Sequence, residues 1–115
     1  MEAAVAIVRL SALAQEHRLA LFRLLVQAGE QGLAAGAIAE ALGVPNSSLS
    51  FHLAQLKQAD LIIQDRQQRS LIYRANYSAM NGIIAYLTEN CCAGAGAGCF
   101  GEGEDSTSQL ERKSA

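Results

Sequence analysis

The feature that most constrains this chain lies in its middle, where two stretches of helical periodicity are separated by a tight turn. Residues 35–42 predict a short helix, and Gly43 follows where a helix C-terminus favours a left-handed residue. The turn passes through Pro45, and a further helix is predicted over residues 46–59. A short helix joined to a second one by a small glycine-bearing turn is a helix-turn-helix. The rest of the chain is expected to pack around this motif.

Further helices and a β-hairpin are predicted on either side of the motif. One proline, no tryptophan and many alanine and leucine residues favour helix. Helical periodicity covers residues 3–13, 16–28 and 77–89. Two strand-like runs are joined by a polar hairpin tip, in the order 61–64, 65–69 and 70–74. The expected fold class is therefore mainly α with a small β-hairpin wing, a winged helix-turn-helix of about five helices.

The second helix of the motif has one apolar and one polar face. Asn46 or Ser47 is expected to cap its start. Leu49, Leu53 and Leu56 recur at helical spacing and are expected to face inward. In a helix-turn-helix the second helix enters the major groove of DNA. The side chains expected to reach base edges and phosphates are hydroxyl, amide, imidazole and ammonium groups: Ser47, Ser48, Ser50, His52, Gln55 and Lys57.

The predicted hairpin tip is basic and polar. Its candidate contacts to phosphates or to the minor groove are Arg66, Gln67, Gln68 and Arg69. Basic side chains outnumber acidic ones within residues 46–74, whereas the whole chain has a formal net charge of −2. This local excess is weak, but it coincides with the polar helix and the hairpin. Together these features predict double-stranded DNA as the partner.

All three cysteines lie close together near the C-terminus, at Cys91, Cys92 and Cys99. Their odd number argues against a disulfide framework. Soft thiolates select soft acceptors, and three of them match the pyramidal valence of trivalent arsenic or antimony. Structural zinc prefers four nitrogen or sulfur ligands. The alternating Ala-Gly run over 93–98 bends easily, so Cys99 is expected to fold back onto the pair.

Two other roles for these thiols stay open. The same cluster could take a heavy metal such as cadmium, lead or mercury. It could also act as a redox sensor, since a disulfide from Cys99 to Cys91 or Cys92 is feasible. A bond between the adjacent pair is disfavoured, because neighbouring Cα atoms lie only ~3.8 Å apart.

Several runs of the sequence resemble the ArsR/SmtB repressors over about residues 5–90. They are LAQEHRLALFRLL at 13–25, IAEALG at 38–43, SSLSFHLAQL at 47–56 and ADLI at 59–62. The resemblance implies a homodimeric winged-helix repressor of a metal or metalloid resistance operon, which leaves its operator when an inducer binds. It also implies a dimer interface built from the first and last helices. The apolar stripe of the last helix fits this role or plain core packing within one chain: Met80, Ile83, Ile84 and Leu87. The first helix has an apolar stripe of its own: Val5, Val8 and Ala12.

The family places its sensor sites in several locations. The helix over 35–42 lacks the cysteine pair of the archetypal arsenic sensor, and the last helix lacks the histidines of the zinc sensors. The arrangement Cys91-Cys92-x6-Cys99 resembles an arsenic-responsive branch with cysteines after the last helix. That resemblance implies As(III) or Sb(III) as the inducer ligand.

The remaining expectations concern organisation and location. A length of 115 residues predicts one domain and excludes a large multi-domain enzyme. We expect a DNA-binding and dimerisation domain over 1–90, an inducer-binding segment over 91–99 and a disordered acidic tail over 100–115. No catalytic arrangement is present, since the cysteine pair is not a Cys-x-x-Cys motif. No apolar run approaches the ~20 residues of a membrane span, and the N-terminus lacks signal-peptide features, so a cytoplasmic protein is expected.

Overall fold

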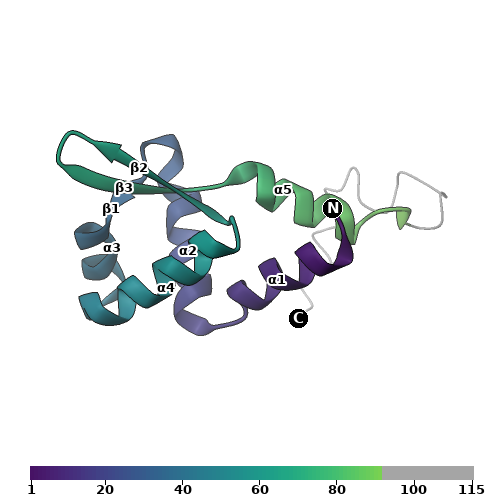
Figure 1. Ribbon diagram of the computed structural model, residues 1–115, viewed down its shortest axis with the longest axis horizontal. Coiled ribbons are helices and arrows are strands. Elements are labelled where there is room, and N and C mark those ends of the chain that lie inside the picture. The colour runs from purple at the N-terminus through teal and green to yellow at the C-terminus, as the bar shows by residue number, and fades with distance from the viewer. Residues whose placement is uncertain (92–115) are drawn as a thin grey trace, which may run out of the picture. The chain divides into compact units, whose positions relative to one another are not determined.

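The computed structural model describes residues 1–91, and the structural statements that follow concern those residues (Figure 1). Its five α-helices are α1 (Ala3–Leu13), α2 (Glu16–Ala28), α3 (Ala35–Leu42), α4 (Asn46–Gln58) and α5 (Tyr77–Leu87). A short 3-10 helix, η1 (Gly29–Gln31), follows α2, and the strands are β1 (Leu33–Ala34), β2 (Ile62–Gln67) and β3 (Ser70–Ala75). The predicted fold class, mainly helical with a small β wing, is confirmed. The expected inducer-binding segment beyond Cys91 and the expected acidic tail lie outside the described residues.

The three strands form one antiparallel sheet in the order β1-β3-β2. Strand β2 continues to Gln67, past the predicted end at residue 64, and Gln67 pairs with Ser70 across the hairpin. The turn is therefore limited to Gln68 and Arg69, and Gln68 adopts a positive φ of 56°. The prediction of a longer hairpin tip was wrong, because cross-strand pairing extends almost to the end of the wing.

Strand β1 was not predicted from the sequence, and a glycine explains its position. Gly32 has a φ of +68°, and a Cβ atom there would lie 2.5 Å from the carbonyl oxygen of Tyr73. Only a residue without a side chain lets the backbone approach β3 this closely. The next residue, Leu33, then pairs with Tyr73. The segment after α2 is thereby fixed to the wing.

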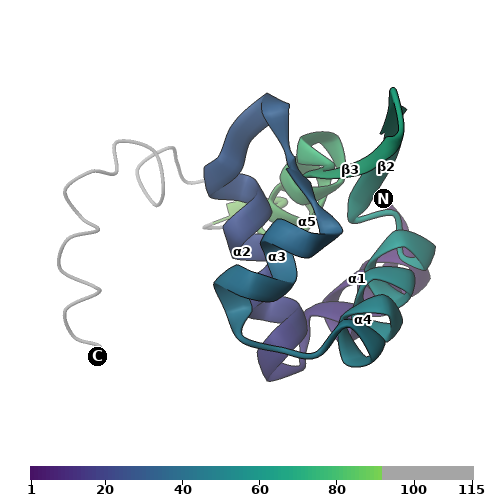
Figure 2. The ribbon, with the colours of Figure 1, turned by 90° about the vertical axis from the view of Figure 1, so that its left-hand side faces the viewer.

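The core lies where α2, α3 and α4 meet the start of the wing (Figure 2). Its largest fully buried side chains are Leu21, Leu25, Ile38, Leu49, Leu56 and Leu61. Burying one such side chain contributes about 1.5–3 kcal/mol. The three leucines of α4 predicted to face inward are buried, which confirms that face of the helix. This core fixes the orientation of α4 and of its opposite face.

The turn between α3 and α4 differs in detail from the prediction. Gly43 takes the left-handed conformation expected of it, and its N–H donates to the carbonyl of Ala39 at 2.8 Å. Helix α4 already begins at Asn46, so Pro45 occupies the N-cap position and no side chain caps the helix. The predicted cap by Asn46 or Ser47 was wrong, because Pro45 has the fixed φ of −68° and extended ψ that an N-cap residue needs.

Helices α1 and α5 carry exposed apolar side chains. On α1 the predicted stripe splits, since Ala12 is buried whereas Val5 and Val8 are exposed. Ile7 and Leu10 of α1 are exposed as well. On α5, Ile83 is buried, but Ile84 and Leu87 are 45% and 61% exposed. Surfaces of this kind are typical of helices that pack against another chain.

Candidate nucleic-acid interface

The polar face of α4 is turned away from the core, as predicted for most of its residues. Ser47, Ser48 and Ser50 are exposed at the start of the helix, and Lys57 is exposed near its end. Gln55 is half-buried. The N-terminal residues of such a helix are those that reach base edges in helix-turn-helix proteins. The exposed hydroxyl groups therefore lie at the part of α4 that suits contact with DNA.

His52 does not share this face, so the prediction that it lies on the outward side of the helix was wrong. Its side chain is 9% exposed, and its Nδ1 lies 3.4 Å from Nη1 of Arg18. Its ring stacks on that of His17, with the ring centroids 5.5 Å apart. Burial, together with the nearby charges of Arg18 and His17, lowers the pKa of His52.

The helical spacing explains why His52 is buried. Residue 52 stands three positions after Leu49 and four before Leu56, and residues at these separations share a helix face. The helical spacing in the sequence therefore already indicated a buried side chain at residue 52. The prediction of an exposed side chain relied on the polarity of the imidazole instead. His52 serves instead as a packing contact between α4 and α2.

Arg18 connects three helices through this histidine. Gln15 caps α2, since its side chain accepts hydrogen bonds from the backbone N–H groups of His17 and Arg18 at 2.9 and 3.0 Å. This cap fixes the first turn of α2. From there the Arg18 guanidinium donates to the carbonyl oxygen of Ala12 at 2.7 Å and lies against His52. The start of α2, the end of α1 and the middle of α4 are thereby held together.

Phe51 is a residue of this surface that sequence reasoning missed. It belongs to the same helix as the exposed serines, and 57% of its surface is accessible. Its ring meets the ring of His52 edge-on, with the centroids 5.8 Å apart. The available signal was its position four residues after Ser47, on the outward side of the helix.

The four predicted wing residues are all exposed: Arg66, Gln67, Gln68 and Arg69. Arg74, also basic, is paired with Asp65 at 2.9 Å on the neighbouring strand. Lys57 of α4 donates to the side-chain oxygen of Gln64 on β2, so its ammonium group lies beside the wing. Among the described residues, Lys57, Arg66 and Arg69 have no carboxylate oxygen within ion-pair distance, so their positive charge is available at the wing tip and the adjoining end of α4.

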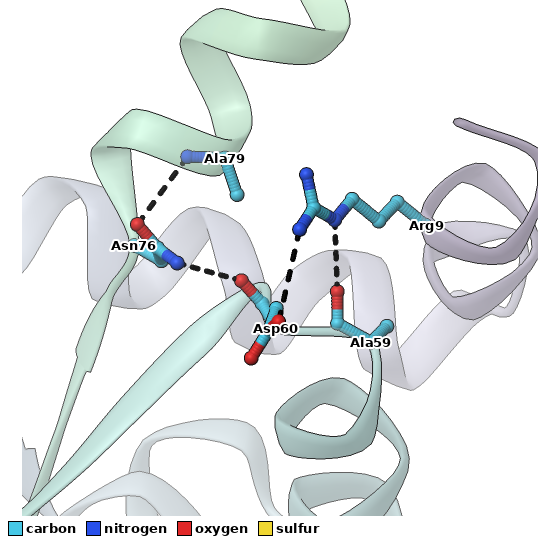
Figure 3. A network of polar contacts seen from close by, with 5 residues as sticks. All are labelled: Arg9, Ala59, Asp60, Asn76 and Ala79. Atoms are coloured by element: carbon cyan, nitrogen blue, oxygen red, sulfur yellow. Dashed lines mark hydrogen bonds and ion pairs between the residues drawn. The ribbon is translucent and has the colours of Figure 1, made fainter. Parts of the chain in front are cut away.

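A polar network links the end of α4 to α1 and α5 (Figure 3). Arg9 of α1 donates to the carbonyl oxygen of Ala59 at 3.0 Å, and its guanidinium lies 3.8 Å from the carboxylate of Asp60. The side-chain amide of Asn76 donates to the carbonyl oxygen of Asp60 at 2.8 Å. The amide oxygen of Asn76 accepts the backbone N–H of Ala79 at 3.3 Å and so caps α5.

The predicted thiol site falls mostly outside the described residues. Cys91 is half-buried, and its backbone N–H donates to the carbonyl oxygen of Thr88 at 3.0 Å. Cys92 and Cys99 lie outside the described residues. Within residues 1–91 no group of three histidine, cysteine or carboxylate side chains comes together to hold a metal ion. In the same part of the chain, no helix has the length and apolar character that crossing a membrane requires.

Comparison with known proteins agrees with this geometry. Residues 13–65 match the model of a family described as a helix-turn-helix domain. The HTH-type transcriptional regulator YgaV of Escherichia coli is 32% identical over 79 residues, which are 69% of this chain and 80% of YgaV. The matched family model ends before the cysteines, so it bears on the helix-turn-helix and the start of the wing.

Two solved structures share the fold. One is the homodimeric winged helix-turn-helix DNA-binding domain of Mb0332 from Mycobacterium bovis, a possible ArsR-family transcriptional regulator. It has a TM-score of 0.60 at 26% identity, covering 76% of this chain and 81% of that one. The other is reduced HlyU from Vibrio cholerae, with a TM-score of 0.58 at 30% identity, covering 77% of this chain and 90% of HlyU.

Proposed function

The chain belongs to the ArsR family of winged helix-turn-helix, DNA-binding transcriptional regulators, and from this premise we propose that it is a cytoplasmic homodimeric repressor released from operator DNA by trivalent arsenic or antimony. The observation that carries the DNA-binding part is the exposed polar face of α4 beside an exposed basic wing. The inducer part rests on the three clustered cysteines. No catalytic role is involved, since the family regulates transcription.

The two DNA-facing elements have separate tasks in this proposal. Helix α4 places Ser47, Ser48 and Ser50 in the major groove, where hydroxyl groups donate to and accept from base edges. Arg66 and Arg69 at the wing neutralise phosphates, which fixes the register on the duplex without reading its sequence. Lys57 joins them from the end of α4.

The homodimer is supported by the exposed apolar side chains of α1 and α5. Ile7, Val8 and Leu87 are each more than half exposed, which costs solvation free energy unless another chain covers them. The homodimeric state of the Mb0332 domain makes a second copy of this chain the expected cover. Two copies present two α4 helices, which suits an operator with two half-sites.

In the inducer step, each As–S bond forms as an arsenite hydroxide leaves as water together with the thiol proton. Three such exchanges at Cys91, Cys92 and Cys99 give a neutral pyramidal arsenic site. Cys91 closely follows α5 in the sequence. Binding of arsenic to this segment is therefore expected to change the conformation of the residues at the end of α5. Asn76 at the start of α5 contacts Asp60 at the end of α4, which provides a route to the DNA-reading helix.

The DNA-binding part is tested with duplexes selected by the protein from a random-sequence library. Anisotropy titration should then give a Kd that rises steeply with salt. The triple variant Ser47→Ala, Ser48→Ala, Ser50→Ala should bind all duplexes with similar, weak affinity. Equal selectivity in that variant would remove α4 from the proposed role.

The inducer part is tested by intact-mass titration of the fully reduced protein with arsenite, beside a variant with all three cysteines changed to serine. The proposal expects one arsenic per chain, loss of three protons, no adduct on the variant and release of the selected duplex. A loss of only two protons would indicate a two-thiol site suited to methylated arsenic. Binding without release of DNA would refute the coupling.

A thiol redox switch is the second candidate. A structure of HlyU, a relative, is of its reduced form, which favours testing oxidation here. In this case peroxide alone would release the duplex, and dithiothreitol would restore binding. Cadmium, lead and mercury serve in the same assay as the heavy-metal alternative. Release by one of these inputs, with none by arsenite, would replace the arsenic proposal.

A further inference from the structure

We propose that Phe51 reads a thymine methyl group in the major groove and is thereby a determinant of operator sequence. This inference rests on the proposed DNA-binding role of α4 and adds an apolar contact to its polar ones. Its basis is that the aromatic side chain of Phe51 is exposed to solvent near the centre of the outward face of the helix and packs against His52.

The first observation is the exposure of Phe51. Its side chain is 57% exposed, although the other large apolar side chains of α4, its leucines, are buried. Covering an exposed aromatic ring on binding therefore offers a stabilisation that folding alone does not provide. The flanking residue Ser50 is exposed and polar, and so is Ser47 one turn before. A single exposed apolar residue is common on protein surfaces, so what distinguishes Phe51 is its place on the helix proposed to face DNA.

The second observation is where the ring lies along and around the helix. The buried side of α4 is formed by four residues: Leu49, His52, Leu53 and Leu56. At about 100° per residue, Phe51 lies roughly opposite the centre of that side, in line with Ser47 and Ala54. It also belongs to the N-terminal half of α4, the part of a recognition helix that contacts bases. Phe51 is therefore placed to meet the floor of the groove.

The third observation is that the ring of Phe51 is supported from behind. It packs edge-on against His52, which in turn stacks on His17 and lies beside Arg18. This edge-on geometry is the favoured one for aromatic pairs. A side chain held in this way loses less conformational entropy on binding than a free one. The buried histidine that was predicted to read DNA instead supports its neighbour.

The chemistry of the major groove identifies the ligand group. Each base pair shows donors and acceptors there, but only thymine adds an apolar group, the C5 methyl. A phenyl ring has no hydrogen bond to offer and gains by covering that methyl. Contact with a cytosine or a purine edge would instead remove polar atoms from water without a partner. Phe51 is thus expected to favour thymine at one position of each half-site.

The test replaces single thymines by deoxyuridine in a duplex selected by the wild-type protein, because the two bases differ only in the methyl group. At one position per half-site the replacement should weaken wild-type binding about 4-fold, the value of burying one methyl-sized group. Phe51→Ala should bind more weakly and show no further loss at that position. Leu19→Ala, which removes an exposed apolar side chain of α2, is the matched control and should keep the full deoxyuridine effect.

Three results would overturn the inference. They are wild-type binding that is indifferent to deoxyuridine at every position, a Phe51→Ala variant that retains the deoxyuridine effect, and a Leu19→Ala variant that loses it. If Phe51→Ala failed to fold, the wild-type deoxyuridine scan and a Phe51→Leu variant with a reduced effect would decide. A wild-type protein that selects no duplex would instead refute the proposed DNA-binding role of α4.

Discussion

Asn76 provides a quantitative test of the junction that joins the end of α4 to α5. Its amide makes two separable contacts, because the oxygen caps α5 at Ala79 and the nitrogen donates to the carbonyl oxygen of Asp60. Asn76→Ala removes both contacts. Asn76→Ser keeps a hydroxyl that caps the helix but has no group long enough to reach Asp60. The difference between the two variants isolates the cap.

The expected magnitudes follow from the type and exposure of each contact. An N-cap side chain typically stabilises a protein by about 1 kcal/mol. The bond to Asp60 is solvent-exposed, so its net contribution lies near the low end for hydrogen bonds, about 0.5 kcal/mol. Asn76→Ala should therefore lower the free energy of unfolding by about 1.5 kcal/mol, and Asn76→Ser by about 0.5 kcal/mol.

Urea unfolding followed by circular dichroism measures both values, with all proteins at one concentration because dimerisation would add to the apparent stability. Ser78→Ala, an exposed change in the same turn of α5, is the control and should lie within about 0.5 kcal/mol of wild type. Equal destabilisation by Asn76→Ala and Asn76→Ser would refute the separation of the cap from the bond to Asp60. Wild-type stability in Asn76→Ala would refute both contacts.

Three further predictions concern the turn glycines, the buried histidine and the wing. Gly32→Ala should destabilise the protein by about 2 kcal/mol or more in a thermal melt, because the added Cβ would collide with a backbone carbonyl. Gly43→Ala, at the same φ but with open space around the Cβ, should cost only about 1–2 kcal/mol. The folded state lowers the pKa of His52, so stability should fall as the pH drops through about 6.5 and below, and a His52→Gln variant measured by urea midpoints should show a flatter profile. Arg66→Gln and Arg69→Gln each remove one phosphate contact per chain, and so two per bound homodimer. Each should therefore reduce the slope of log Kd against log salt by about 2, and an unchanged slope would exclude phosphate contact at that residue.

Much of the fold follows from the sequence because its signals are local. The leucine spacing of α4 and the glycine after α3 each depend on residues within one or two turns. Strand β1 is different, because its two residues become a strand only by pairing with β3, which comes about forty positions later. The end of β2 was missed for the same reason, since cross-strand pairing and not composition decides where a hairpin turns.

The orientation of the candidate site residues follows from the sequence where residue type and helical position agree, and it does not where they conflict. Ser47, Ser48 and Ser50 are polar and lie on the outward side. His52 is polar yet faces inward, and Phe51 is apolar yet faces outward. A prediction from residue type alone assigns His52 to the exposed face and Phe51 to the buried face, which is the reverse of the structure. The support of His52 by Arg18, a contact across 34 positions, is not visible in any local pattern.

The wing also has an open edge. In the order β1-β3-β2, strand β2 is an outer strand whose described pairing is with β3 alone. Outer strands attract strands of other molecules and so favour aggregation, and charged side chains counteract this. Asp65 and Arg66 lie on this strand and both carry charge. Arg66, which is proposed to contact phosphates, thus also protects the protein in its free state. A wing rebuilt with apolar residues is expected to lose solubility before it loses its fold.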